Sequence, residues 1–277
     1  DSYDVEVKRN LIDQNFNFKE FKLTDVQKTA FEEIKIRFSQ NKNVLFKGIT
    51  SSGKTEIYIS LINELLNSKN QILFLVPEIA LTTQLVERLK IYFAKNLVVY
   101  HSGLSINQRA ELWNEIIKND KPQVIIGARS AVLLPYNKLK LIIVDEEHEQ
   151  SYKQYEPSPR YHARDAALML GNIHNSNVIL GSATPSLESF YNSKTSKKLS
   201  LVELNSRFGN IPLPKIELIN LSDKVKNGKM YGLFSDSLIK RIKDVVDNNK
   251  QVILFQNRRG YSPVLECNSC GHSPKCI

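Results

Sequence analysis

The chain has 277 residues, of which 42% are hydrophobic, and this is enough for one large or two modest domains with packed cores. Its 38 basic residues outnumber the 29 acidic ones, and the net charge of +9 favours a polyanionic partner such as nucleic acid. No apolar run approaches the ~20 residues of a membrane span, so we expect no membrane partner. Three cysteines crowd into the last eleven residues, unlike a secreted disulfide framework, and we therefore expect a cytoplasmic protein.

Residues 1–22 are polar and show no periodicity. We predict a linker or the tail of an upstream module in a longer protein, and we expect no signal peptide. A helix is predicted to begin at Thr24, whose hydroxyl suits an N-cap. Its apolar face comprises Val26, Ala30, Ile34 and Phe38. Gln27 lies in the first turn, where its amide can read adenine, although spacing alone favours a solvated glutamine.

The stretch GITSSGKT, residues 48–55, follows an apolar run at 44–46 and precedes a helical apolar pattern over 57–66. Its spacing is that of a phosphate-binding P-loop, with a chance glycine-rich turn as the alternative. In a P-loop, backbone N–H groups and the start of the next helix surround the phosphates. Lys54 then reaches the β- and γ-phosphates, and Thr55 binds Mg²⁺. The predicted ATP-binding residues are Gln27, Gly48, Ile49, Thr50, Ser51, Ser52, Gly53, Lys54 and Thr55.

Continuous apolar runs alternate with amphipathic segments along the middle of the chain. Strands are predicted at 44–46, 72–76, 97–100, 124–127, 141–144 and 178–180, and helices at 79–93, 108–117 and 186–191. This alternation predicts an α/β fold with a parallel sheet covered by helices on both faces. Ligands of such sheets bind beyond the carboxyl ends of the strands, which is where the motifs fall.

The tetrapeptide DEEH, residues 145–148, follows the strand predicted at 141–144 and is called the acidic box below. In a P-loop protein, we predict that Asp145 holds Mg²⁺ and that Glu146 orients and deprotonates the attacking water. With Lys54, these are the predicted catalytic residues; a solvated acidic turn is the alternative. Small hydroxyl residues in GSATP can hydrogen-bond the acidic box across the sheet, although they are also routine helix caps. The residues predicted to couple this phosphate site to moving parts of the protein are His148, Ser182 and Thr184.

Residues 149–167 carry tyrosines and basic residues around two prolines, which prevent a continuous helix. Aromatic rings offer faces for base stacking and cations contact phosphates, so this loop is a candidate nucleic-acid contact that reports to the adjacent ATP site. An equally open alternative is a surface loop whose tyrosines pack on the core. The candidate DNA-binding residues of this loop are Tyr152, Lys153, Tyr155, Arg160, Tyr161 and Arg164.

A polar, basic stretch at 193–200 marks a predicted domain boundary between residues 195 and 196. The elements predicted beyond it are strands at 215–220 and 251–255, a turn region at 223–232 and a helix at 236–246. Arg258 and Arg259 follow the last strand and can contact DNA or phosphate; a solvated turn is the alternative.

Cys267, Cys270 and Cys276 close the chain, and the Cys-x-x-Cys spacing suits thiolate ligands of Zn²⁺. Zinc takes four ligands, so we expect the remaining ones to lie beyond residue 277 in a longer protein. Three free thiols are the alternative interpretation.

Six motifs occur in the order found in superfamily 2 helicases: GITSSGKT, LVPEIALTTQ, GARSAVLLP, DEEH, GSATPS and QNRRGYSP. Together with CNSCGHSPKC, they resemble the primosomal replication-restart DNA helicases of the PriA family, from about Leu23 to the end of the chain. The resemblance implies a bacterial, ATP-dependent 3′→5′ DNA helicase that acts on single-stranded and forked DNA. It also implies primosome proteins and single-stranded-DNA-binding protein as partners.

The same resemblance implies a RecA-like ATP-binding domain over 23–195, the start of a second RecA-like lobe over 196–264 and the start of a zinc-binding region over 265–277. It places Arg129 near the DNA backbone, and it implies two zinc ions on the complete cysteine cluster. The family's upstream modules and its arginine finger fall outside this chain. Because such a finger is worth ~10³–10⁵ in rate, we expect this piece to bind ATP but to hydrolyse it poorly. The alternatives are an RNA-directed ATPase of the same superfamily and a fork-binding scaffold with a regulatory nucleotide site.

Overall fold

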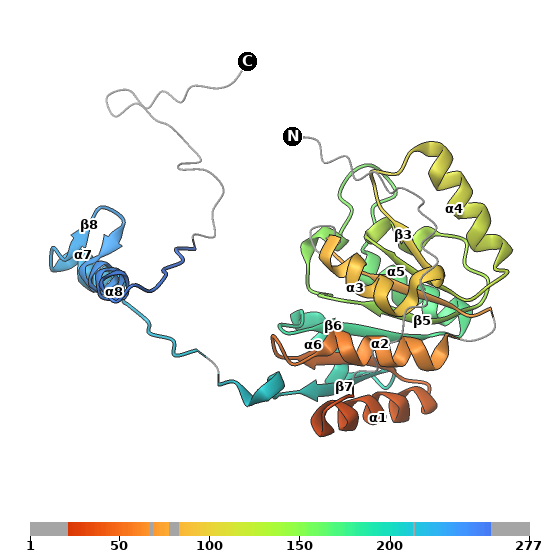
Figure 1. The fold of residues 1–277 in the computed structure, drawn as a ribbon, viewed down its shortest axis with the longest axis horizontal. Helices are drawn as coiled ribbons and strands as arrows, with labels where there is room; N and C mark the ends of the chain where they lie inside the picture. Colours follow the sequence, from red (N-terminus) through yellow and green to blue (C-terminus); the bar gives the residue numbers. More distant parts are fainter. Residues whose placement is uncertain (1–21, 67–68, 78–82, 213, 256–277) are drawn as a thin grey trace, which may run out of the picture. The chain divides into compact units, whose positions relative to one another are not determined.

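The computed structural model describes residues 22–66, 69–77, 83–212 and 214–255 (Figure 1). The chain divides after Pro212 into two compact units. In the described residues, the larger unit contains one sheet with its covering helices, and the smaller contains two helices and two short strands. Within these residues no helix is long and apolar enough to cross a membrane.

Seven parallel strands form the sheet of the larger unit, in the spatial order β3-β4-β2-β5-β6-β1-β7. Their bounds are β1 Asn43–Gly48, β2 Gln71–Leu75, β3 Leu97–Tyr100, β4 Gln123–Gly127, β5 Leu139–Val144, β6 Asn177–Ser182 and β7 Leu199–Leu204. The central strands are buried over almost their whole length, as expected of a parallel sheet between two helical layers. The predicted α/β fold is thereby confirmed.

Helices cover both faces of this sheet (Figure 1). Their bounds are α1 Asp25–Ser39, α2 Lys54–Leu65, α3 Thr83–Phe93, α4 Ile106–Lys118, α5 Ala163–His174 and α6 Leu187–Thr195, with short 3-10 turns η2 Ala94–Asn96, η3 Arg129–Leu133, η4 Gln150–Tyr152 and η5 Phe208–Asn210. Side chains of α1, α2 and α3 pack into one core cluster, and those of α4 and α5 pack into another. Because successive strand residues point to opposite faces, the neighbours Leu45 and Phe46 belong to different clusters.

Helix α1 begins as predicted, directly after Thr24. The Thr24 hydroxyl accepts a hydrogen bond from the backbone N–H of Gln27, and the Gln27 Oε1 atom accepts one from the backbone N–H of Thr24. This reciprocal pair is a capping box, and it fixes the Gln27 side chain at the start of the helix. Helix α6 begins in a related way at Ser186, whose hydroxyl accepts from the backbone N–H of Ser189.

The larger unit extends beyond the boundary predicted between residues 195 and 196. Strand β7 lies after that boundary, yet it pairs with β1 over its whole length, from Asn43 opposite Leu199 to Gly48 opposite Leu204. The polar stretch at 193–200 is therefore a connection within the unit, and the division falls after Pro212. The prediction missed β7, whose apolar residues Leu199, Leu201, Val202 and Leu204 come directly after the polar residues 193–198.

In the smaller unit, two helices accompany two short antiparallel strands: α7 Leu221–Lys226, β8 Met230–Tyr231, β9 Phe234–Ser235 and α8 Asp236–Asp247. The helix predicted at 236–246 is confirmed by α8. The turn region predicted at 223–232 instead contains most of α7 and the whole of β8.

The strands predicted at 215–220 and 251–255 are wrong, because neither segment pairs with a strand in the described part of the chain. Leu218 is 93% exposed and Ile253 is 91% exposed. An apolar run becomes a strand only where a neighbouring strand and a core hold it, and these two segments have neither among the described residues.

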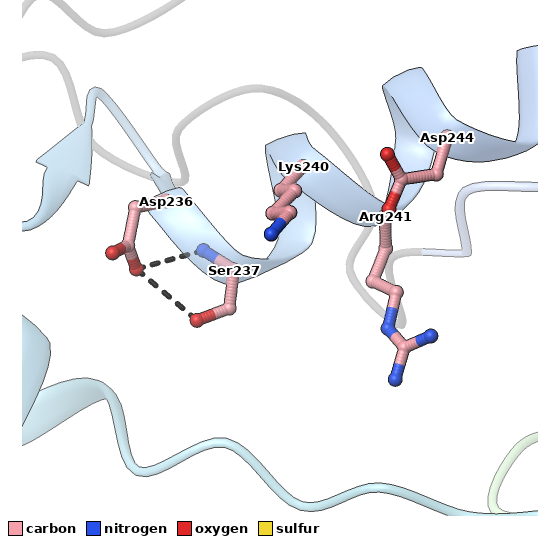
Figure 2. A pocket seen from close by; sticks show the side chains of 5 residues that line it. All are labelled: Asp236, Ser237, Lys240, Arg241 and Asp244. Atoms are coloured by element: carbon pink, nitrogen blue, oxygen red, sulfur yellow. Dashed lines mark hydrogen bonds between the residues drawn. The ribbon is translucent and has the colours of Figure 1, made fainter. Parts of the chain in front are cut away.

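Figure 2 shows the first turns of α8, where Asp236, Ser237, Lys240, Arg241 and Asp244 line a hollow of about 430 Å³. Asp236 accepts hydrogen bonds from the backbone N–H and the hydroxyl of Ser237, and Lys224 of α7 donates to it at 2.7 Å. The hydrogen bond from Lys224 is the main reason why the pKa of Asp236 is lowered. None of the predicted site residues lines this hollow.

Candidate active site

Three neighbouring strands bring the predicted catalytic motifs together. The sheet order places β6 between β1 and β5. The carboxyl end of β1 leads into the P-loop, that of β6 into the GSATP stretch and that of β5 into the acidic box. Lys47, next to the P-loop, lies opposite Ser182 of β6, and Val144, next to the acidic box, lies opposite Leu180. Motifs that are far apart in the sequence therefore meet at one edge of the sheet, as predicted.

The P-loop ends in a helix start that is open to an anion. Gly53 is the N-cap of α2, and no side chain caps the first N–H groups of that helix. Gly53 has a φ of +90°, and a Cβ atom added there would lie 2.1 Å from Nε2 of Gln27, so only glycine fits. The Ser52 hydroxyl is buried without a hydrogen-bond partner among the described residues. This loop has the features of a phosphate cradle rather than of a chance turn.

Lys54 links the P-loop to the acidic box. Its Nζ atom donates to the carbonyl oxygen of Gly48 at 3.1 Å and lies 3.8 Å from Oε1 of Glu146. The side chain is only 11% exposed, so its ammonium group is held at the site rather than in bulk water. A phosphate bound to the loop would compete with Glu146 for this cation.

Gln27 is buried against the P-loop, so the interpretation favoured from its spacing, a solvated glutamine, is wrong. It is 4% exposed, and its Nε2 atom donates to the carbonyl oxygen of Ser52 at 3.0 Å. The predicted reading of adenine by this amide stays a prediction. The sequence already held the relevant signal, because Thr24 and Gln27 have the spacing of a capping box.

Asp145 is a half-buried carboxyl group directly after β5. The Tyr58 hydroxyl donates to its Oδ1 atom at 3.2 Å. Burial, with the nearby Glu146 carboxylate as the second cause, raises the pKa of Asp145 from 3.8 to about 6, although Lys54 and Tyr58 act in the opposite direction. Gly181 of β6 makes room for this pair, because a Cβ atom there would lie 1.8 Å from the Tyr58 hydroxyl. Asp145 is therefore hydrogen-bonded within the fold, unlike a carboxylate of a fully solvated acidic turn.

The donor set here fits Mg²⁺. Asp145 offers carboxylate oxygens and Thr55 a hydroxyl oxygen, and hard oxygen ligands are those that Mg²⁺ prefers. A cation would also relieve the repulsion between Asp145 and Glu146 that helps to raise the pKa of Asp145. Within the described residues no cluster of three His, Cys, Asp or Glu side chains could hold a metal.

Glu146 stands between Lys54 and His148. Its backbone adopts a φ of +47°, a left-handed conformation that costs a non-glycine residue about 1–2 kcal/mol. Its Oε2 atom lies 3.7 Å from Nδ1 of His148, which in turn is 2.8 Å from the Ser182 hydroxyl. The predicted cross-sheet contact is confirmed for Ser182. Thr184 contributes its backbone N–H to the Ser182 hydroxyl at 2.9 Å.

The sequence prediction missed the role of Glu147, which is fully buried. Its carboxylate accepts hydrogen bonds from the backbone N–H and hydroxyl of Ser186, from the Ser189 hydroxyl at 2.8 Å and from Arg164 at 3.3 Å. These contacts join the acidic box to the starts of α5 and α6. The available signal was Ser186 as a helix N-cap, whose hydroxyl accepts from a backbone N–H and keeps its own proton to donate to a carboxylate.

Two of the candidate DNA-binding residues in the loop at 149–167 are corrected by the structure. Tyr152 is fully buried, and its hydroxyl donates to the carbonyl oxygen of Asp145 at 2.7 Å, so its ring offers no face to a base. Arg164 is bonded to Glu147, to Asp165 and to the Ser186 hydroxyl. Both residues attach the loop to the acidic box. For Tyr152, this agrees with the alternative interpretation, in which tyrosines of the loop pack on the core.

The remaining candidates gather at the outer part of the loop. Arg129, Lys153, Gln154, Tyr155, Glu156 and Arg160 line a cavity of about 640 Å³. The Tyr155 ring is 60% exposed, and the Lys153 ammonium lies 5.0 Å from its centroid. Arg129 donates weakly to backbone oxygens of Ser151 and Lys153 at 3.4 Å, while half-buried Tyr161 donates to the Arg129 carbonyl oxygen. An exposed ring beside several cations suits a nucleic-acid strand.

The predictions for the end of the chain lie outside the described residues. They concern Arg258 and Arg259 as DNA contacts, and Cys267, Cys270 and Cys276 as zinc ligands.

The DEAD/DEAH box helicase family matches residues 24–192, which is more than half of the chain. The chain therefore belongs to the DEAD/DEAH box helicases. Membership of this family implies the use of ATP and Mg²⁺, in agreement with the P-loop and the acidic box.

Within this class, the chain is similar to the replication restart protein PriA of Bacillus subtilis (strain 168), with 39% identity over 92% of this chain and 31% of the relative. It is also similar to PriA of Haemophilus influenzae, with 43% identity over 92% of this chain and 34% of the relative. The resemblance to replication-restart helicases is thus confirmed, and the chain spans about a third of the length of these curated relatives. A solved structure of RecG bound to a three-way DNA junction covers 76% of this chain, at 21% identity and a TM-score of 0.49; 27% of that chain is covered.

Proposed function

We propose that this chain is the ATP-binding part of a DNA helicase of replication restart, in which ATP hydrolysis drives 3′→5′ movement along single-stranded DNA. The observation that carries the proposal is the meeting of Lys54, Asp145 and Glu146 at one sheet edge, with the loop at 149–167 attached directly behind them. The family match and the similarity to PriA proteins support DNA as the polymer and replication restart as the process.

The chemistry follows from the arrangement of these side chains. The open start of α2 and the P-loop N–H groups bind the phosphates of ATP. Asp145 and Thr55 would hold Mg²⁺, which would supply positive charge next to the phosphates of ATP. Lys54 shifts from Gly48 and Glu146 to the phosphates, which frees the Glu146 carboxylate to orient a water and accept its proton. His148 and Ser182 hold Glu146 from the other side.

The loop at 149–167 connects DNA contact with this chemistry. Its outer cavity contains Arg129, Tyr155 and Arg160, which bind phosphates and stack on a base. Its base is bonded to the carbonyl oxygen of Asp145 through Tyr152 and to Glu147 through Arg164. A strand that repositions the outer loop therefore pulls on the backbone that carries the catalytic carboxylates.

The whole protein's partners are proposed by similarity to PriA: single-stranded and forked DNA, primosome proteins and single-stranded-DNA-binding protein. Zinc bound by Cys267, Cys270 and Cys276 with further ligands of a longer protein belongs to the same proposal. We further propose that the 277-residue chain alone is a poor ATPase, because helicases of this kind complete the site with an arginine finger of the second lobe, worth ~10³–10⁵ in rate.

The test is ATP binding and hydrolysis by this chain with and without single-stranded DNA. We expect Mg²⁺-dependent ATP binding that Lys54→Ala abolishes, accompanied by slow turnover. Glu146→Gln should keep the binding and remove the residual turnover, which separates catalysis from a scaffold with a regulatory nucleotide site. Tighter binding of single-stranded RNA than of DNA of equal length at matched salt would replace DNA by RNA in the proposal.

A further inference from the structure

After β7, the chain runs along the outside of the P-loop. The backbone N–H of Ile49 donates to the carbonyl oxygen of Leu204 at 3.1 Å, and the backbone N–H of Phe208 donates to the carbonyl oxygen of Ser51 at 2.9 Å. Two backbone hydrogen bonds thus fasten residues 204–208 to the phosphate-binding loop. Arg207 lies within this segment, directly before the residue that bonds to Ser51.

Arg207 is a partly buried cation without a partner in the described part of the chain. Its Nε atom is shielded from solvent and makes no hydrogen bond, and its guanidinium forms no ion pair with any residue that the structure describes. Arg37 offers a contrast: its Nε atom is also buried and unbonded, but its Nη2 atom donates to Glu33 at 2.9 Å. A half-buried guanidinium that has no anion beside it among the described residues is free to bind one.

The neighbourhood of Arg207 indicates the chemistry of that partner. The P-loop beside it is shaped for phosphate, and an arginine fork matches phosphate oxygens in geometry and charge. We propose that Arg207 binds the phosphate chain of the nucleotide held by the P-loop, as a second cation beside Lys54. This inference rests on the proposed binding of ATP and adds a contact from a segment that lies outside the P-loop and the acidic box.

A contact at this position has a consequence for the connection between the two units. Residues 207–212 lead from the P-loop to the point where the chain divides. A guanidinium bound to the phosphates would hold this segment in place while nucleotide is present and release it afterwards. The nucleotide would then control the mobility of the chain segment that leads to the second unit.

The experiment compares four forms of the full 277-residue chain: the unchanged protein, Arg207→Ala, Arg207→Lys and Arg37→Ala. The last removes a similarly buried arginine at the opposite, amino edge of the sheet, where α1 ends before β1. Calorimetric titrations with ATP, tripolyphosphate and adenosine in Mg²⁺ give the affinities. Thermal unfolding without ligand reports any loss of folding.

We expect Arg207→Ala to weaken ATP and tripolyphosphate binding about tenfold, the loss typical of one charge-assisted hydrogen bond. Arg207→Lys should recover part of the affinity, and Arg37→Ala should bind both ligands like the unchanged protein. Arg207→Ala affinities within twofold of the unchanged protein, or a loss confined to adenosine, would overturn the contact with phosphate. Failure of the unchanged protein to bind ATP would instead refute the proposed function itself.

Discussion

The base and the tip of the loop at 149–167 contain the same residue types, but these are largely buried at the base and exposed at the tip. At the base, Tyr152 is fully buried and bonded to the Asp145 carbonyl oxygen, and Arg164 is bonded to buried Glu147. At the tip, Tyr155 is 60% exposed and Arg160 lines an open cavity. The difference shows that one short segment is divided into a buried anchor beside the acidic box and an exposed tip that lines a cavity. Residue type alone does not separate these two roles.

The strongest way to break the anchor is to remove the Glu147 carboxylate. Glu147→Ala leaves Arg164 and two serine hydroxyls without their acceptor, so the free energy of unfolding should fall by about 3–5 kcal/mol. Urea unfolding followed by circular dichroism measures this. Glu156→Ala at the exposed tip is the matched control and should stay within about 0.5 kcal/mol. Equal effects of the two substitutions would contradict the division of the loop.

The acidic box next to the anchor should show a distinct pH dependence. The pKa of Asp145 is about 6 in the folded chain, above its ordinary value of 3.8, so the folded state binds this proton more tightly than the unfolded state does. Without Mg²⁺ or nucleotide, the stabilisation from protonated Asp145 is therefore present below pH 3.8 and is lost as the pH rises through 6. The free energy of unfolding should fall by roughly 3 kcal/mol over this range. Asp145→Asn should remove this dependence from urea unfolding measured between pH 4.5 and 7. If Asp145→Asn keeps the same pH dependence of stability, that dependence comes from other titrating groups.

A smaller effect is expected at the tip, and it should appear in DNA binding alone. Tyr155→Ala should weaken single-stranded DNA binding by about 1–3 kcal/mol, because it removes a stacking face, while stability changes little. Fluorescence anisotropy at fixed salt measures the affinity. Tyr191→Ala, which removes a tyrosine of α6 that is 66% exposed, controls for loss of an exposed ring. A similar loss of affinity in both variants would show that the cavity is not the DNA contact.

Much of the fold and of the catalytic core could be predicted from the sequence, because local pattern determines both. The apolar strands, the GxxxxGKT spacing and a carboxylate at a strand end each follow from short-range sequence and place Lys54, Asp145 and Glu146. What could not be predicted depends on long-range packing. The contact of Gln27 with Ser52, the acceptor role of Glu147 toward Ser189 and the pairing of β7 with β1 all join residues distant in sequence.

The same reasoning explains the two strands that were predicted wrongly in the smaller unit. The apolar runs at 215–220 and 251–255 have strand character by composition, but a strand also needs a neighbour to pair with. In the larger unit, β7 is similarly rich in apolar residues and is a strand, because β1 lies beside it. Pairing, rather than composition, decided the outcome at both places.

The central claim is that the anchor transmits DNA contact at the tip to the nucleotide site, and Tyr152→Phe tests it most directly. This substitution removes one hydroxyl that donates to the Asp145 carbonyl oxygen and keeps the buried ring. The measurement is the ATP affinity of the chain with and without saturating single-stranded DNA, in the unchanged protein and in the variant. We expect DNA to change the ATP affinity of the unchanged protein, and Tyr152→Phe to reduce that change severalfold while each ligand alone still binds. An identical effect of DNA in both proteins would contradict the account.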